Sequence, residues 1–145
     1  MTIQERAEAY HRTFPKWPEP QVSGRWLNAI WIMGNNYKGT GYYGAYPSSY
    51  LKRIRSLFPD CHQVMHLFSG SLPDPESTEE VFVDLNTKAG GHVLQVNAEE
   101  MSEAVENNSF DLILADPPYD KENAKKYGLP LPNKRRVFEQ CHKVL

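Results

Sequence analysis

The sequence predicts an α/β fold built on a mainly parallel β-sheet, and two observations support this prediction. Four short apolar segments occur after residue 60, each followed by a polar residue or a turn: residues 63–68, 81–83, 93–96 and 112–115. Nearly continuous apolar strands are typical of a parallel sheet covered on both faces, and such sheets bind ligands at the carboxyl ends of their strands. Segments with helical periodicity lie on either side of these runs, as an α/β fold requires.

Two helices and an aromatic segment are expected before the first of these strands. Residues 2–14 have a helical pattern, with Thr2 as a suitable N-cap and Glu5 three residues later, which is the arrangement of a capping box. Residues 22–46 are rich in Trp, Tyr, Gly and Asn, which indicates one or two strands and then a long loop. These aromatic side chains suit either stacking on a substrate or filling a core. The apolar spacing of residues 47–58 predicts the second helix.

Two further helices and two short connections complete the expected pattern. The helices are expected over residues 102–106 and 135–145, while the connections between the first three strands span only residues 71–80 and 86–92. A parallel crossover usually takes a dozen or more residues, so we expect no full helix in either connection. One face of the sheet is then expected to be covered thinly, or by the aromatic N-terminal segment, or by a partner.

Length and composition are those of one folded domain. The chain has 145 residues, of which 40% are hydrophobic, enough to bury a single core. We expect one domain over residues 1–145, with the first helix and the aromatic segment in residues 1–46 and the ligand-binding part in residues 47–145. No apolar stretch approaches the length of a bilayer span, and the charged N-terminus lacks a signal-peptide core, so a cytoplasmic protein without membrane contact is expected. The two cysteines are far apart in the sequence and predict neither a disulfide nor a metal site.

Charge is distributed unevenly along the chain. The formal net charge is only −2, but residues 74–116 hold eleven acidic residues and one basic residue, whereas residues 121–145 hold seven basic residues and two acidic ones. If the protein contacts phosphates, these contacts are therefore expected outside the middle of the chain. The alternative is that both charge runs are solvated faces of helices and loops.

The segment Asp116-Pro117-Pro118-Tyr119 follows the fourth apolar run and carries the clearest chemical signal. Two consecutive prolines remove two backbone donors, so the turn offers mainly hydrogen-bond acceptors. An exocyclic amine of adenine or cytosine has two N–H donors, which the Asp116 carboxylate and the Pro117 carbonyl can accept, and this localises the nitrogen lone pair toward an electrophile. Tyr119 offers a ring for a flipped-out base to stack on, worth about 1–3 kcal/mol in single-strand-binding proteins. A purely structural Pro-Pro turn beside an aromatic residue is the alternative.

This motif resembles the Asp/Asn-Pro-Pro-aromatic signature of the S-adenosylmethionine-dependent amino-methyltransferases of nucleic acids. The resemblance covers roughly residues 43–145 and implies the front half of a Rossmann-like class I methyltransferase sheet. It also implies S-adenosyl-L-methionine as the cofactor, no metal, and methyl transfer to an exocyclic nitrogen of a nucleobase, preferably in DNA, with RNA left open. The catalytic residues that it implies are Asp116, Pro117, Pro118 and Tyr119.

The strand ends before this motif resemble the cofactor site of the same family, in the expected order. Residues 66–71 resemble the loop whose backbone amides meet the methionine portion of the cofactor. Asp84 matches the acidic position that holds the ribose hydroxyls, and Asn97 matches the position that contacts adenine. The segment that enters the helix at residue 47 resembles one that touches the methionine carboxylate, although a helix start bounded by Gly and Pro explains it equally well. The implied cofactor-binding residues are Tyr46, Pro47, Phe68, Ser69, Gly70, Ser71, Asp84, Leu85, Asn97, Ala98 and Asp116.

In this family a Pro-Gly-Gly turn and three further strands would follow residue 145, so strands five to seven are expected to be missing. A second copy or a partner chain is then expected to cover the open edge of the sheet. Three alternatives stay open: a methyltransferase-like binding module without turnover, a methyltransferase of RNA or of a protein glutamine, and a piece of a longer chain.

Overall fold

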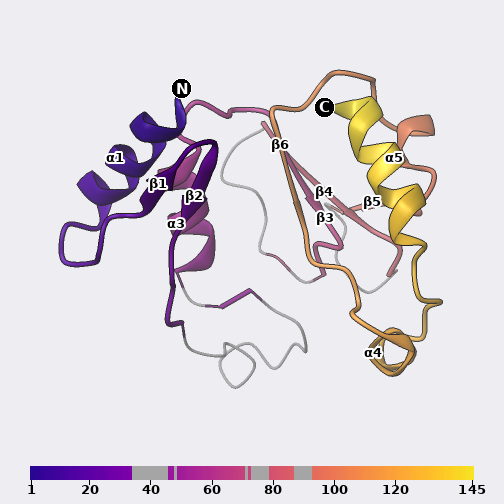
Figure 1. The fold of residues 1–145 in the computed structure, drawn as a ribbon. Coiled ribbons are helices and arrows are strands. Elements are labelled where there is room, and N and C mark those ends of the chain that lie inside the picture. Colours follow the sequence, from indigo (N-terminus) through magenta and orange to yellow (C-terminus); the bar gives the residue numbers. More distant parts are fainter. Residues whose placement is uncertain (34–45, 48, 71, 73–78, 87–92) are drawn as a thin grey trace. The chain divides into compact units, whose positions relative to one another are not determined.

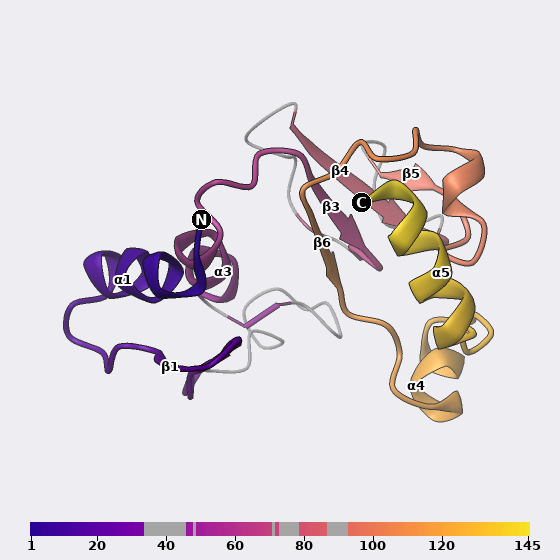
Figure 2. The same ribbon diagram turned by 45° about the horizontal axis from the view of Figure 1, so that its top comes forward.

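The computed structural model describes residues 1–33, 46–47, 49–70, 72, 79–86 and 93–145, which Figures 1 and 2 show as ribbons. The chain divides into two compact units, Met1–Asp60 and Cys61–Leu145. This division falls after Asp60 and not after residue 46, where the aromatic segment was expected to end. That all 145 residues belong to one domain stays a prediction.

Helix α1 (Ile3–Thr13) opens the first unit and confirms the predicted capping box. The Glu5 amide donates to Thr2 Oγ1 over 3.3 Å, and the Thr2 amide donates to Glu5 Oε2 over 2.6 Å. Two of the amides that the first turn of a helix leaves unpaired are thus satisfied by side chains. The hydrogen bond from the Thr2 amide, together with one from the Thr2 side chain, holds the pKa of the Glu5 carboxyl below its usual value.

An antiparallel hairpin and a second helix follow in this unit. Strands β1 (Gln21–Ser23) and β2 (Trp26–Asn28) agree with the expectation of one or two strands here, and the structure shows that they pair antiparallel. The expected glycine-bearing loop falls largely on residues 34–45, outside the described residues. Helix α3 (Tyr50–Leu57) begins later than the expected residue 47. The reason is the left-handed backbone of Ser49, whose φ of 69° is incompatible with a right-handed helix.

The core of the first unit encloses a cation. Arg53 of α3 is only 4% exposed and donates a hydrogen bond to the Tyr10 hydroxyl. Its guanidinium lies 4.8 Å from the Trp17 ring centroid and 4.9 Å from that of Phe14. Trp31 stacks on Tyr10 with the ring centroids 5.9 Å apart. The aromatic segment was expected either to stack on a substrate or to fill a core, and Trp31 fills a core.

The second unit contains a four-stranded sheet in which every neighbouring pair is parallel. Its strands are β3 (Val64–Leu67), β4 (Glu80–Asp84), β5 (Leu94–Gln95) and β6 (Leu112–Ala115). They lie in the order β5-β4-β3-β6, so the chain progresses outward from β3 and then returns to add β6 on the other side. The predicted α/β class and parallel sheet are confirmed at this level.

Three helical segments accompany the sheet: η1 (Met101–Glu103), α4 (Lys121–Lys126) and α5 (Lys134–Val144). Helix α5 agrees with its prediction, but the expected α-helix over residues 102–106 is a single 3-10 turn. Helix α4 was not predicted; it is short and polar, and it starts where Asp120 Oδ1 accepts the Asn123 amide over 2.8 Å. No helix within the described segments has both the length and the apolar character needed to cross a bilayer.

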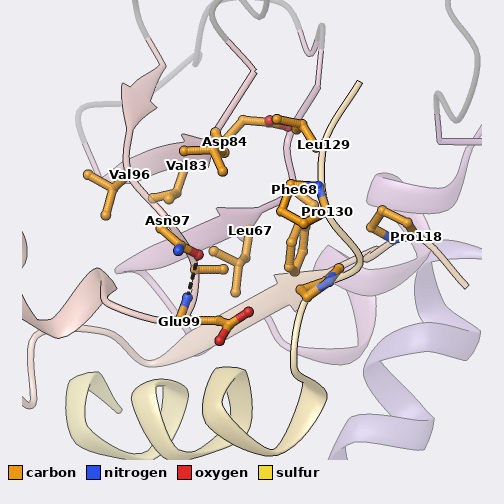
Figure 3. Close-up of a pocket in the computed structure, with 13 residues that line it drawn as sticks. Leu67, Phe68, Val83, Asp84, Val96, Asn97, Glu99, Pro118, Leu129 and Pro130 are labelled. Atoms are coloured by element: carbon orange, nitrogen blue, oxygen red, sulfur yellow. Dashed lines mark hydrogen bonds between the residues drawn. The ribbon is translucent and has the colours of Figure 1, made fainter. Parts of the chain in front are cut away.

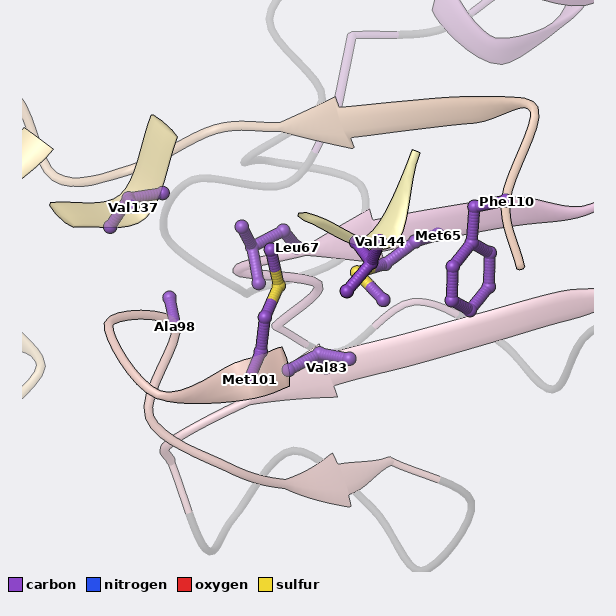
Figure 4. Close-up of a cluster of buried hydrophobic side chains, with 8 residues drawn as sticks. All are labelled: Met65, Leu67, Val83, Ala98, Met101, Phe110, Val137 and Val144. Atoms are coloured by element: carbon purple, nitrogen blue, oxygen red, sulfur yellow. The ribbon is translucent and has the colours of Figure 1, made fainter. Parts of the chain in front are cut away.

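Apolar side chains join one face of the sheet to α5 and η1 (Figure 4). Met65 and Leu67 of β3 are fully buried, as is Met101 of η1. Side chains alternate along a strand, so His66 and Phe82 point to the opposite face, where their rings meet edge to face at 4.8 Å. The connections at residues 71–80 and 86–92 lie mostly outside the described residues. The core cluster consists of Met65, Leu67, Val83, Ala98, Met101, Phe110, Val137 and Val144.

Candidate functional site

A pocket opens at the carboxyl ends of β3, β4 and β5 (Figure 3). It contains about 500 Å³ of empty space, part of which is open to solvent. Strand ends form one side, and the segments after β6 and between α4 and α5 form the other. The residues that line it are Leu67, Phe68, Val83, Asp84, Leu85, Val96, Asn97, Ala98, Glu99, Pro118, Leu129, Pro130 and Pro132.

Six residues that the sequence analysis selects line this pocket: Phe68, Asp84, Leu85, Asn97, Ala98 and Pro118. They lie far apart in the sequence and come together because parallel strands end at the same edge of the sheet. Asp116, Pro117 and Tyr119 belong to the same turn as Pro118, and Ser69 and Gly70 to the same turn as Phe68. The roles of all these residues stay predictions.

The turn after β3 has an unusual backbone. Phe68 has a φ of 61° and Gly70 a φ of 56°. Glycine adopts this left-handed region at no steric cost, whereas an aromatic residue rarely does so, and such strain is concentrated at functional sites. The Phe68 side chain lines the pocket, so the strained residue is also a wall of the candidate site.

Asp84 braces this turn. Its Oδ2 accepts the Gly70 amide over 2.8 Å, and its Oδ1 accepts the Asn86 amide over 2.7 Å. The Asp84 side chain ends β4 and is 9% exposed. Each carboxylate oxygen has a further lone pair, so Asp84 can accept another hydrogen bond in the pocket.

Asn97 and Glu99 supply the acceptors beyond β5. Asn97 Oδ1 accepts the Glu99 amide over 3.0 Å. Glu99 Oε1 accepts the Asn133 amide over 2.9 Å, and Glu99 Oε2 lies 3.7 Å from Arg136 Nη1. Glu99 therefore lines the pocket and also holds the start of α5 against it.

The segment Leu129–Pro132 was not selected from the sequence, and neither was Glu99. Leu129, Pro130 and Pro132 all line the pocket, and Figure 3 shows this segment running past Phe68. A Leu-Pro-Leu-Pro run is a recognisable signal for a stiff, extended segment. Its place beside the strand ends could not be found from the sequence, because that place is set by the contacts of Glu99 with Asn133 and Arg136.

Asp116 follows β6 and is half-buried. Its amide donates to the Leu67 carbonyl over 3.4 Å, and its Oδ1 accepts the Tyr119 hydroxyl over 3.2 Å. Burial raises the pKa of Asp116 above its usual value, and the hydrogen bond from Tyr119 opposes part of this shift. The Tyr119 side chain is 74% exposed, so its ring is accessible from solvent.

The polar side chains that line the pocket are all acceptors or carry an acceptor. Asp84 and Glu99 are carboxylates and Asn97 is an amide, while the walls are formed by leucine, valine, proline and phenylalanine. Such a site suits a ligand with a flat apolar part and several hydroxyl or amino donors. Two carboxylates at the walls disfavour a phosphate group in the same place.

The remaining predicted residues are not brought to the pocket by the described contacts. Tyr46 and Pro47 belong to the first unit, where the Tyr46 ring lies 4.9 Å from that of Tyr50. Ser71 lies outside the described residues. In the part of the chain that the structure describes, His, Cys, Asp and Glu side chains form no group of three or more that could hold a metal ion.

Comparison with known proteins identifies no relative. The chain matches no family model, no curated protein and no solved structure at a significant level.

Proposed function

We propose that this protein is an S-adenosylmethionine-dependent methyltransferase that acts on an exocyclic amino nitrogen of a nucleobase, preferably in DNA. One observation carries the proposal: a single pocket is lined by residues from three strand ends and by Pro118 of the Asp-Pro-Pro-Tyr turn. The strand order supports it. In a doubly wound sheet of Rossmann type, ligands bind where the strand order reverses, and here the order reverses between β3 and β6.

The pocket residues fit S-adenosylmethionine by their chemistry. Asp84 and Asn97 carry acceptors for ribose hydroxyls and for the adenine amino group, and the apolar walls suit the adenine ring. Ser69 Oγ is buried and has no hydrogen-bond partner among the described residues, so a polar group of a ligand at this turn would satisfy it. When bound, the cofactor supplies an electrophilic methyl group.

The Asp116 turn then receives the base. The target amine donates one hydrogen bond to the Asp116 carboxylate and a second to the Pro117 carbonyl. These two hydrogen bonds localise the lone pair of the amine on its nitrogen. Tyr119 Oη gives up its hydrogen bond to Asp116, and the exposed Tyr119 ring stacks on the base. Asp116 must be ionised to accept the hydrogen, so its raised pKa places a lower pH limit on activity.

Incubation with radiolabelled S-adenosylmethionine tests the proposal. Separate reactions contain single-stranded DNA, duplex DNA, RNA and protein, with the Asp116→Asn variant as a control for contaminating methyltransferases. Label in DNA or RNA that is lost in the variant supports the proposal, and digestion to nucleosides identifies the methylated base. Label only in protein, or in no substrate although calorimetry detects cofactor binding, contradicts it.

A binding module without turnover is the second candidate. Both Asp84 oxygens already accept backbone amides, which favours a role for this residue in supporting the turn. Calorimetry with S-adenosylmethionine and S-adenosylhomocysteine separates the two candidates when combined with the label assay. Binding of either compound without label transfer supports the module.

A further inference from the structure

A second, open groove lies beside the pocket, between α4 and the segment that follows it. Lys121 and Lys125 of α4 line it together with the apolar side chains of Ala124, Leu129 and Leu131. Cations thus adjoin an apolar surface, the combination that suits a sugar-phosphate chain.

The two lysines differ from the two arginines of this region, Arg135 and Arg136, in lacking an acidic partner among the described residues. Arg135 Nε lies 2.9 Å from Glu139 Oε1, and Arg136 Nη1 lies 3.7 Å from Glu99 Oε2. Among the described residues, neither Lys121 nor Lys125 forms an ion pair or a side-chain hydrogen bond, and both are exposed. They stand one turn apart on α4, about 6 Å along the helix axis, where like charges repel. No ion pair among the described residues therefore accounts for these two charges.

The groove adjoins the candidate methyl-accepting turn. Lys121 comes two residues after Tyr119 and five after Asp116, so the Cα atoms of Lys121 and Asp116 are at most about 18 Å apart. Leu129 lines both the groove and the pocket. A ligand in the groove is therefore a near neighbour of any base held at Asp116.

We propose that this groove binds the phosphodiester backbone of the nucleic acid whose base enters the Asp116 turn. The inference rests on the proposed function and names the surface that holds its substrate. Two unpaired cations one turn apart follow a linear polyanion, and the apolar floor receives its sugars. Asp84 and Glu99 repel phosphates from the pocket itself, so the backbone lies in the groove and not in the pocket.

The test measures binding of a fluorescent single-stranded DNA 20-mer by anisotropy across a series of NaCl concentrations. The groove variant is Lys121→Gln/Lys125→Gln. The charge-matched control is Lys134→Gln/Lys143→Gln, which removes two lysines of α5 that lie outside the groove. Loss of two phosphate contacts is expected to reduce the slope of log K against log salt by about 1.4, and affinity at 50 mM salt by at least about 10-fold. The control is expected to change affinity by less than about 3-fold.

Two further ligands test whether the groove recognises the phosphodiester backbone or negative charge in general. An RNA of the same length is expected to depend on the groove as DNA does, because both share the phosphodiester backbone. A poly-glutamate peptide is expected to bind weakly and without dependence on the groove. Three outcomes overturn the inference. The groove and control variants weaken binding equally, the wild type binds neither DNA nor RNA at low salt, or the peptide binds as strongly and with the same dependence on the groove.

The label assay distinguishes failure of this inference from failure of the proposed function. If the groove variant methylates nucleic acid as well as the wild type does, the proposed role of the groove is contradicted and the proposed function is still supported. Groove-dependent binding without methyl transfer, when calorimetry shows bound cofactor, supports the groove and contradicts the function.

Discussion

The two units of this chain place their charged groups in opposite ways. In the first unit two cations are held by neighbouring side chains: Arg53 is enclosed by aromatic rings, and Arg6 donates to both carboxylate oxygens of Asp60 over 2.6 and 3.0 Å. In the second unit the core cluster on one face of the sheet is apolar, and acceptors gather where the strands end, with Asp84 and Glu99 at the wall of a pocket.

This difference separates a charge that supports the fold from one that is available to a ligand. A buried charge stabilises a fold only when its neighbours compensate for the lost hydration. Arg53 has compensation from four aromatic rings and the Tyr10 hydroxyl, although its Nε has no hydrogen-bond partner among the described residues. Within the described part of the chain, the exposed Tyr119 hydroxyl is the one side-chain hydrogen-bond partner of Asp116, and burial raises the pKa of Asp116 despite this hydrogen bond.

The largest expected effect follows from replacing Asp116. The Asp116→Asn variant keeps the size of the side chain but loses the anionic acceptor, so methyl transfer is expected to fall by about 100- to 1,000-fold. Because the pKa of Asp116 is raised in the folded chain, ionised Asp116 lowers the stability of the fold at neutral pH. This loss of stability is absent below the pKa of Asp116 in the unfolded chain and grows as pH rises through its pKa in the folded chain. The thermal midpoint of the variant is therefore expected to be equal to or higher than that of the wild type at pH 7. A lower midpoint with unchanged activity would make Asp116 a structural residue.

A large effect on stability is expected at Arg53. The Arg53→Met variant removes the enclosed cation and leaves the Tyr10 hydroxyl unpaired, which is expected to cost about 2–4 kcal/mol. All three tryptophans lie in the first unit, so urea unfolding followed by tryptophan fluorescence reports on this unit alone. The control is Arg136→Met in the second unit, followed by far-UV circular dichroism, where the exposed ion pair is expected to contribute less than about 1 kcal/mol. Equal effects of both substitutions would remove the contrast between the two units.

A moderate effect is expected from the contact that holds the Leu129–Pro132 segment at the pocket. Glu99→Ala removes the acceptor of the Asn133 amide and the partner of Arg136, so cofactor affinity is expected to fall by about 2- to 10-fold. Glu99→Gln keeps an acceptor and is expected to have the smaller effect. Calorimetry measures the affinity, and amide exchange at Asn133 reports the same contact without cofactor. Unchanged exchange in Glu99→Ala would show that Glu99 does not hold this segment.

The smallest effect concerns acid and the first unit. The hydrogen bond from the N-terminal ammonium, together with Arg6, lowers the pKa of Asp60 to about 2 from a usual 3.8. The stability contributed by ionised Asp60 is present above pH 3.8 and is lost as pH falls toward 2. NMR titration of the Asp60 carboxyl is expected to give this low value. Asp60→Asn is expected to remove this part of the pH dependence of tryptophan-detected unfolding between pH 4 and pH 2, and an unchanged dependence would contradict the assignment.

The elements that the sequence predicted well are those with a local cause. The run Leu112–Ala115 is a strand over the expected residues because a short apolar run flanked by polar residues has few other ways to be buried. The Thr2 and Glu5 box starts α1 for an equally local reason. Helix α4 was missed because a single apolar residue, Ala124, forms no apolar stripe among five polar ones. The segment η1 was shorter than expected because its few apolar residues bury equally well in one 3-10 turn.

The sequence by itself determined the class of the fold, the parallel strands and the acceptor chemistry of the Asp116 turn, since each depends on residues that are neighbours in the chain. Only the tertiary structure decided which of these residues share a pocket. Phe68, Asp84, Asn97 and Pro118 meet because β3, β4, β5 and β6 run parallel and end at one edge. Glu99 and the Leu129–Pro132 segment join them through one hydrogen bond and one ion pair across more than thirty residues of chain, a contact that no local pattern encodes.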